Sequence, residues 1–239
     1  MPVLCGACRR TCSPDELTIP KLYRVAPAGF MNDQQTVNNM EAVWRSLDEL
    51  CSELEDGEWG TPTDCPGWSV QDQLSHLVGS ECRLLGRPRP DYVPEETGHV
   101  KNDIGHSNEV LVGVRRSLAG GKVLEEFREV TGQRLAILRG MTESDFDEET
   151  DTPIGRAPVR DLLAIRIFDA WVHEQDIRRA LGRPGHMDGA VARHAMDRMV
   201  MAMPYVLGRK VQPEDGTGVV MNINGLAGRV FAIAMQGNR

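Results

Sequence analysis

Apolar residues recur at helical spacing in two stretches near the start of the chain. The first stretch, residues 36–54, places its apolar members on one face of a helix: Val37, Met40, Val43, Trp44, Leu47, Leu50, Cys51 and Leu54. A loop at 58–68 follows, and Ser69 with Asp72 three residues later predicts a capping-box start for a second helix. That helix carries its own stripe, made of Val70, Leu74, Leu77, Val78 and Leu84. Both patterns predict amphipathic helices that pack one face against a core.

The pattern continues with two further helices and two long connections. A third helix is predicted in two pieces, 108–118 and 123–138, interrupted by Gly120 and Gly121. A Pro-rich loop at 86–105 precedes it and an acidic loop at 141–157 follows it; loops as long as the first are often functional lids. The fourth helix is predicted from Pro158, which suits a first helical turn, to Leu181. Four helices with one long crossover predict a mainly α four-helix bundle.

After residue 183 the pattern changes. A Met-rich stripe between residues 191 and 203 predicts a helix with flexible core side chains, and residues 204–218 are predicted to be irregular. Two short apolar runs, 219–223 and 230–235, predict strands joined across 224–228. Two strands alone are barely stable. We therefore expect residues 184–239 to be the start of a small α/β domain, truncated at the chain end.

The composition and net charge limit the kinds of molecule that the protein is expected to bind. The 239 residues are 41% hydrophobic and 26% charged, and the net charge of −8 with a pI of about 5.3 argues against a nucleic-acid partner. No apolar run approaches the roughly 18 residues of a membrane span, and the N-terminus lacks the apolar segment of a secretory signal. These features predict a cytoplasmic protein that binds neither nucleic acid nor membrane.

Half of the six cysteines lie in residues 1–33, which show neither helical nor strand periodicity. Cys5, Cys8 and Cys12 have the close spacing of a zinc or iron–sulfur motif, but a structural zinc site needs four ligands and the next histidine is His76. We expect an irregular N-terminal extension with reduced thiols rather than a metal site.

Two polar side chains lie beside the apolar face of the fourth helix. Asp169 and His173 are four residues apart, so they project from one side of it. Either they form a satisfied polar pair at the edge of the core, which the short pattern alone favours, or they are two ligands of a divalent metal. His76, within the second helix, is by itself more typical of a structural histidine. Together the three make a His-Asp-His set on facing helices, which would leave zinc an open fourth position.

Three motifs carry a resemblance to a known family. They are Cys65-Pro66-Gly67-Trp68-Ser69-Val70 with His76-Leu77-Val78-Gly79, the loop His99-Val100-Lys101-Asn102-Asp103-Ile104-Gly105, and Trp171-Val172-His173-Glu174-Gln175-Asp176-Ile177-Arg178. With them the chain resembles the mycothiol-dependent maleylpyruvate isomerase family, within the DinB-like four-helix-bundle metalloenzymes, over residues 36–235. The resemblance implies a metal-binding bundle at 34–183 and, at 184–239, the beginning of a sterol-carrier-like domain that helps to close the pocket.

The resemblance also implies a ligand set. A divalent metal, expected to be zinc, would be held by His76, Asp169 and His173. The acidic position is a glutamate in the isomerase itself, so the shorter aspartate is expected to pull the metal closer or to change its selectivity. Asp176, three residues after His173, is an alternative ligand, or a hydrogen-bond partner that fixes the tautomer of the imidazole. His99 and Trp171 are candidates for the pocket, although the residue pattern alone favours a solvated loop histidine for His99.

The reaction that the resemblance implies uses mycothiol as the thiol cosubstrate. Coordination of its thiol in the open position lowers the thiol pKa. The thiolate adds to an electrophilic double bond of a small molecule, the adduct rotates, and expulsion of the thiol turns cis into trans. The alternatives are a mycothiol S-transferase in detoxification, in which the sulfur stays on the product, and a non-catalytic metal-binding bundle. The substrate and the oligomeric state do not follow from the sequence.

Overall fold

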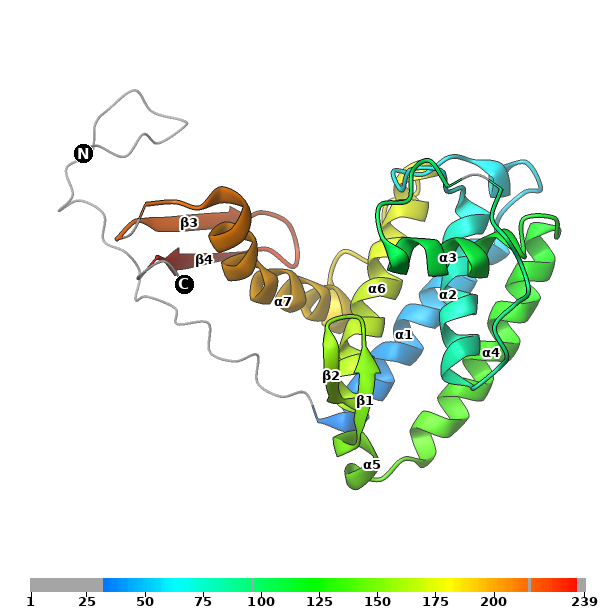
Figure 1. The fold of residues 1–239 in the computed structure, drawn as a ribbon, viewed down its shortest axis with the longest axis horizontal. Coiled ribbons are helices and arrows are strands. Elements are labelled where there is room, and N and C mark those ends of the chain that lie inside the picture. The colour runs from blue at the N-terminus through cyan, green and yellow to red at the C-terminus, as the bar shows by residue number, and fades with distance from the viewer. Residues whose placement is uncertain (1–31, 96, 215, 236–239) are drawn as a thin grey trace. The chain divides into compact units, whose positions relative to one another are not determined.

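The computed structural model describes residues 32–95, 97–214 and 216–235 (Figure 1). These residues group into two compact units, one made of 32–201 with 225–227 and the other of 202–224 with 228–235. The expected N-terminal extension, with Cys5, Cys8 and Cys12, lies outside the described residues except for its last two. The domain boundaries at residues 33 and 183 stay predictions.

Four long helices build the first unit: α1 (Asp33–Ser52), α2 (Val70–Leu84), α4 (Gly120–Gly140) and α6 (Val159–Ala180). Helix α1 packs beside α4 and α6, and α2 packs beside the same two helices. The consecutive helices α1 and α2 therefore lie diagonally across the bundle, and the short α3 (Asp103–Gly113) packs on α2 (Figure 1). The predicted four-helix bundle is confirmed.

The core of the bundle consists of the apolar stripes that the sequence predicts. Residues from all four long helices are completely buried at its centre, among them Val43, Leu47, Leu77, Val130 and Ile167. Each fully buried side chain of this size contributes roughly 1.5–3 kcal/mol. Packing of these stripes, rather than helix propensity, stabilises the bundle.

Side-chain caps set where the first two helices begin. The backbone N–H of Asp72 donates to Ser69 Oγ at 3.3 Å, and the backbone N–H of Ser69 donates to Asp72 Oδ2 at 3.0 Å, which confirms the predicted capping box. Helix α1 begins three residues earlier than predicted, because Asn32 Oδ1 accepts from the backbone N–H of Gln35 at 2.8 Å.

The prediction of one third helix interrupted by two glycines is wrong. The segment forms two separate helices, and α3 begins at Asp103 because the side chain of Asn102 accepts from the Gly105 N–H at 2.9 Å. Gly120 is the first residue of α4, and a Cβ built on it would lie 2.1 Å from the Trp59 ring. The glycine at position 120 thus permits a close approach of helix and indole and does not break a helix.

The acidic segment at 141–157, predicted as a loop, contains regular structure. Thr142 and Asp145 form a capping box for the short α5 (Glu143–Asp147). An antiparallel hairpin follows, with β1 (Glu149–Thr152) paired to β2 (Gly155–Pro158) so that Glu149 lies opposite Pro158. Pro158 is then the N-cap of α6, so the helix begins at Val159, one residue later than predicted. Strands of four residues leave too few positions for alternation to be recognised in the sequence.

The last part of the chain begins with α7 (Gly189–Val206). The predicted irregular segment at 204–218 is wrong in its first half, because α7 continues through Pro204 and a π-helical turn covers Leu207–Val211. A proline near a helix end removes one hydrogen bond and need not end the helix. The two predicted strands are confirmed as the antiparallel hairpin of β3 (Gly218–Ile223) and β4 (Arg229–Ala234). Among the described residues, no helix combines the length and the apolar character that crossing a membrane requires.

Candidate metal centre

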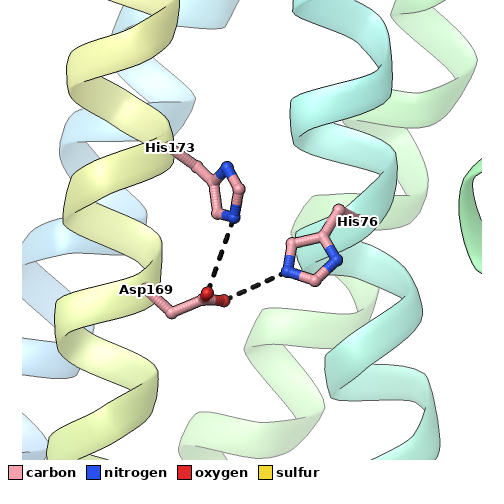
Figure 2. A group of neighbouring side chains, drawn as sticks. All are labelled: His76, Asp169 and His173. Carbon is pink, nitrogen blue, oxygen red and sulfur yellow. Dashed lines mark hydrogen bonds and ion pairs between the residues drawn. The ribbon is translucent and has the colours of Figure 1, made fainter. Parts of the chain in front are cut away.

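Adjacent helices bring His76, Asp169 and His173 together. His76 projects from α2, while Asp169 and His173 project from successive turns of α6, so that the three side chains converge between the two helices (Figure 2). Asp169 Oδ2 lies 3.2 Å from His76 Nε2, and Asp169 Oδ1 lies 3.5 Å from His173 Nε2. One potential ligand atom from each residue lies within 4.8 Å of the other two. The helical spacing of four residues on α6 produces this convergence, because it stacks both side chains on the same face.

The surroundings favour, for His76 and Asp169, the protonation states that metal ligands need. Burial lowers the pKa of His76, an effect that the nearby Asp169 only partly opposes, so this imidazole is neutral near pH 7. For Asp169, burial alone would raise the pKa. The positive charge of Arg166, with contributions from His76 and His173, instead holds the pKa of this carboxyl well below its ordinary range. A neutral imidazole and an ionised carboxylate are the forms that bind divalent metals.

A buried ion network supports Asp169 from behind. Arg166, one helical turn before it, donates to Asp169 Oδ2 at 2.5 Å and to Glu81 Oε1 at 2.9 Å. Arg134 on α4 donates to the second oxygen of Glu81 at 3.1 Å. All the members except Asp169 are less than 10% exposed. A carboxylate held by a buried guanidinium keeps its orientation, because leaving either charge unpaired in the core would cost several kcal/mol.

Trp68 forms an aromatic wall beside both imidazoles. Its ring centroid lies 5.3 Å from that of His76 and 5.9 Å from that of His173, with the second pair stacked. The indole N–H donates to the buried carboxylate of Glu109 on α3. Glu109 also accepts from His99 at 2.8 Å and pairs with Arg116 at 3.1 Å. Burial alone would raise the pKa of Glu109, but the hydrogen bonds from Trp68 and His99 and the charge of Arg116 lower it.

The three further candidates from the sequence do not belong to the convergent group. Asp176 contacts Gln73 Nε2 at 3.4 Å and Arg179 at 2.5 Å. His99 contacts Glu109 rather than an imidazole of the group, and its ring packs on the backbone of Gly67. Trp171 donates its indole N–H to the His186 carbonyl at 2.8 Å. Asp176 and His99 therefore contact residues that surround the group, and Trp171 contacts another part of the bundle.

Sequence reasoning missed several residues of this region. Gln73 precedes His76 by three residues, and Arg166 precedes Asp169 by three, so both lie on the same helix faces as the ligand candidates. That spacing was a usable signal. Glu109 and Trp68 come together only through the packing of α3 on α2, which no local pattern encodes.

The chain's own thiols near this region are poor nucleophiles. Burial raises the pKa of Cys65 and, despite an opposing effect of Arg115, that of Cys82. Thiols with raised pKa values are protonated at neutral pH and react slowly. Neither of these two thiols is therefore suited to act as a nucleophile at the group of Figure 2.

The donor set fits a divalent metal in type and charge. Two imidazole nitrogens and one carboxylate oxygen are the ligands that reactive zinc sites use, and three protein ligands leave a position open. One atom does not fit completely: His76 Nδ1 is buried and has no hydrogen-bond partner among the residues that the structure describes. Metal-binding histidines usually donate this second N–H to an acceptor. The ligand set is therefore suited to a metal, but it is more firmly supported on the His173 side.

Comparison with known proteins places these helices in a family. A sequence model of the mycothiol maleylpyruvate isomerase N-terminal domain matches residues 40–178. Uncharacterised proteins from two strains of Mycobacterium tuberculosis are 22% identical over 148 residues, which is 61% of this chain and 56% of theirs. The chain thus spans little more than half the length of these curated relatives.

Solved structures agree in fold. The crystal structure of the mycothiol-dependent maleylpyruvate isomerase gives a TM-score of 0.59 at 16% identity, covering 86% of this chain and 82% of that chain. A point mutant of the same enzyme gives 0.58 at 15% identity, with the same coverage. At this identity the likeness concerns the fold alone. The family match, in contrast, covers more than half of the chain and includes the positions of His76, Asp169 and His173. The chain therefore belongs to the family of the mycothiol maleylpyruvate isomerase N-terminal domain.

Proposed function

We propose that this protein is a metal-dependent, mycothiol-using enzyme of the maleylpyruvate isomerase family. The observation that carries the proposal is the convergence of His76, Asp169 and His173 from two adjacent helices, with ligand atoms within 4.8 Å of one another. The divalent metal is expected to be zinc, because two nitrogens, one oxygen and an open position suit it. Asp176 is not assigned as a ligand, since its contacts are with Gln73 and Arg179.

In this proposal the chain's residues prepare the site before any ligand binds. Arg166 keeps Asp169 ionised and oriented, and burial keeps the imidazole of His76 neutral. The Trp68 ring covers the two imidazoles on one side and limits access of water. Such preorganisation avoids reorganisation during the reaction, which is a major source of catalytic power.

The chemistry proposed is nucleophilic addition by a thiol. A divalent metal bound to these residues would lower the thiol pKa and make a thiolate available at neutral pH. The thiolate of mycothiol adds to one carbon of an electrophilic double bond, the electron pair of that bond moves onto the electron-withdrawing group that activates it, and the bond between the two carbons becomes single. Rotation about it and expulsion of the thiolate then restore the double bond in the trans form. The proposed location is the cytoplasm, and the partners are mycothiol and a small electrophile.

The first test is metal content. Purified protein should contain about one equivalent of zinc or another divalent ion by elemental analysis, and His173→Ala should lose it. His194→Ala is the matched control, because His194 is also a buried helical histidine, but its Nε2–H donates to the Ala164 carbonyl at 2.9 Å rather than to Asp169. Absence of metal from the wild type, with no uptake on adding zinc, would refute the metal-dependent function.

Product analysis then separates the reactions. With metal-loaded protein and mycothiol, a cis-configured electrophile should be converted to its trans isomer with no net consumption of thiol. A conjugate that retains the sulfur would identify an S-transferase instead. Metal binding without any thiol-dependent turnover across a panel of electrophiles would identify a non-catalytic bundle.

A further inference from the structure

A buried glutamine lies directly behind one of the ligand candidates. Gln73, in α2, is completely buried, and its side-chain carbonyl Oε1 contacts His173 Nδ1. Its amide Nε2 lies 2.8 Å from Thr63 Oγ1 and 3.4 Å from Asp176 Oδ2. The glutamine thus connects the outer nitrogen of His173 to two polar groups on other parts of the bundle.

Two independent contacts determine which end of the Gln73 amide faces His173. Asp176 offers only acceptor oxygens when ionised, so it requires the NH₂ group of the amide. Thr63 has a single hydroxyl proton, which it donates to the Trp68 carbonyl at 2.9 Å, so towards Gln73 it acts as an acceptor. Both neighbours therefore take the NH₂ group, and the carbonyl oxygen is left to face His173.

The orientation of the amide in turn determines the tautomer of His173. A carbonyl oxygen only accepts hydrogen bonds, so the proton of the neutral imidazole lies on Nδ1. The lone pair is then on Nε2, the nitrogen that faces Asp169 Oδ1 at 3.5 Å. We propose that Gln73 is a positioning residue that makes Nε2 the metal-binding atom of His173, an inference that rests on the proposed function.

The second imidazole has no equivalent support. His76 Nδ1 is buried without a hydrogen-bond partner among the described residues, so no acceptor on that side holds a proton on Nδ1, whereas Nε2 lies 3.2 Å from Asp169 Oδ2. Preorganisation of the imidazoles therefore depends on the contact between Gln73 and His173. Loss of an outer partner of a metal-binding histidine typically weakens metal affinity by 10- to 100-fold.

The test compares two glutamines on the same helix. Gln73→Leu removes the acceptor while keeping a side chain of similar size. Gln71→Leu is the matched control, because Gln71 also makes side-chain hydrogen bonds, to the Arg115 and Leu118 carbonyls at 2.9 and 3.0 Å, but has no contact with the group. The affinity for Zn²⁺ is measured by competition with a chromophoric chelator, and the ligand field by the visible spectrum of Co²⁺-loaded protein.

We expect Gln73→Leu to bind Zn²⁺ roughly 10- to 100-fold more weakly and to alter the Co²⁺ spectrum, with Gln71→Leu like the wild type. Wild-type affinity and spectrum in Gln73→Leu would overturn the role of Gln73 while leaving the proposed function intact. Failure of the wild type to bind either ion would instead refute the proposed function.

A second measurement does not depend on the variant folding. In metal-free wild-type protein labelled with ¹⁵N-histidine, two-bond ¹⁵N–¹H correlation spectra at mildly alkaline pH distinguish the two neutral tautomers. The His173 ring, assigned by comparison with His173→Ala, should carry its proton on Nδ1. A proton on Nε2 would overturn the inference.

Discussion

The contact between Trp68 and Glu109 allows a sharp test of how the wall beside the imidazoles is held. Trp68→Phe keeps an aromatic ring but removes the indole N–H that donates to the buried carboxylate. Trp44→Phe makes the same chemical change at a site where the indole nitrogen is buried without a partner among the described residues. Both tryptophans are buried, with 8% and 4% of Trp68 and Trp44 exposed. The loss of packing should therefore be similar in the two variants.

The difference between the variants isolates the hydrogen bond. A hydrogen bond to a charged group contributes about 1.5–3 kcal/mol net, so Trp68→Phe should lower the free energy of unfolding by about that much more than Trp44→Phe. For a protein of this length, 1 kcal/mol corresponds to roughly 2–4 °C in Tm, which gives a Tm difference of about 3–12 °C. The assay is thermal and urea unfolding followed by far-ultraviolet circular dichroism in the presence of a chelator.

A second background tests the assignment to Glu109. Glu109→Gln keeps an acceptor but removes the charge, and neutral hydrogen bonds are roughly half as strong as charge-assisted ones. The cost of Trp68→Phe should therefore fall by about half in that background. Equal losses for Trp68→Phe and Trp44→Phe, or an unchanged cost beside Gln at position 109, would refute the reasoning.

Three further outcomes follow from the structure. Gly120→Ala should destabilise the protein by about 1–3 kcal/mol because its Cβ would lie 2.1 Å from the Trp59 ring, whereas Gly121→Ala, with open space around it, should be neutral or stabilise by up to about 1 kcal/mol in urea unfolding. The pKa of Glu109 is lowered below its ordinary 4.5, so its stabilising charge is fully present above pH 4.5 and is lost as the pH falls towards the lowered value. The difference in unfolding free energy between wild type and Glu109→Gln should therefore shrink as the pH falls below 4.5 and should stay constant above it. Treatment with a chelator should leave the helical circular dichroism unchanged, because Arg166 already pairs with the Asp169 carboxylate; loss of helical signal would show that a bound metal is needed for folding.

Much of the bundle could be predicted because its signals are local. The stripe in α1 repeats over several turns, and Ser69 with Asp72 marks the start of α2 through hydrogen bonds between near neighbours. Asp169 and His173 were recognisable for the same reason, because two residues that are four apart on a helix project from the same face. The pairing with His76 needed the additional expectation that the two helices face each other in a four-helix bundle, and the resemblance to the family then assigned the same three residues as ligands.

Other features depended on tertiary contacts and were not visible. Gly120 was interpreted as a break, whereas the space that it leaves is filled by the Trp59 ring of a distant segment. The hairpin at 149–158 has strands too short for alternation to show. Gln73 was not singled out from the sequence, because the direction of its amide is determined by the positions of Thr63 and Asp176 around it.

The buried charges around Asp169 explain how its carboxylate can stabilise the fold and also be available to bind a cation. Glu81 and Asp169 supply two negative charges, and Arg134 and Arg166 supply two positive ones, through contacts of 2.5–3.1 Å. Any of these charges left alone in the core would cost several kcal/mol, but the four together carry no net charge. Within Asp169 the two oxygens differ, because Oδ2 contacts Arg166 and His76, whereas Oδ1 faces only His173 among the residues that the structure describes. One oxygen is therefore committed to the ion network, and the other, beside the His173 nitrogen that Gln73 leaves unprotonated, is the oxygen with the fewest competing partners for a cation.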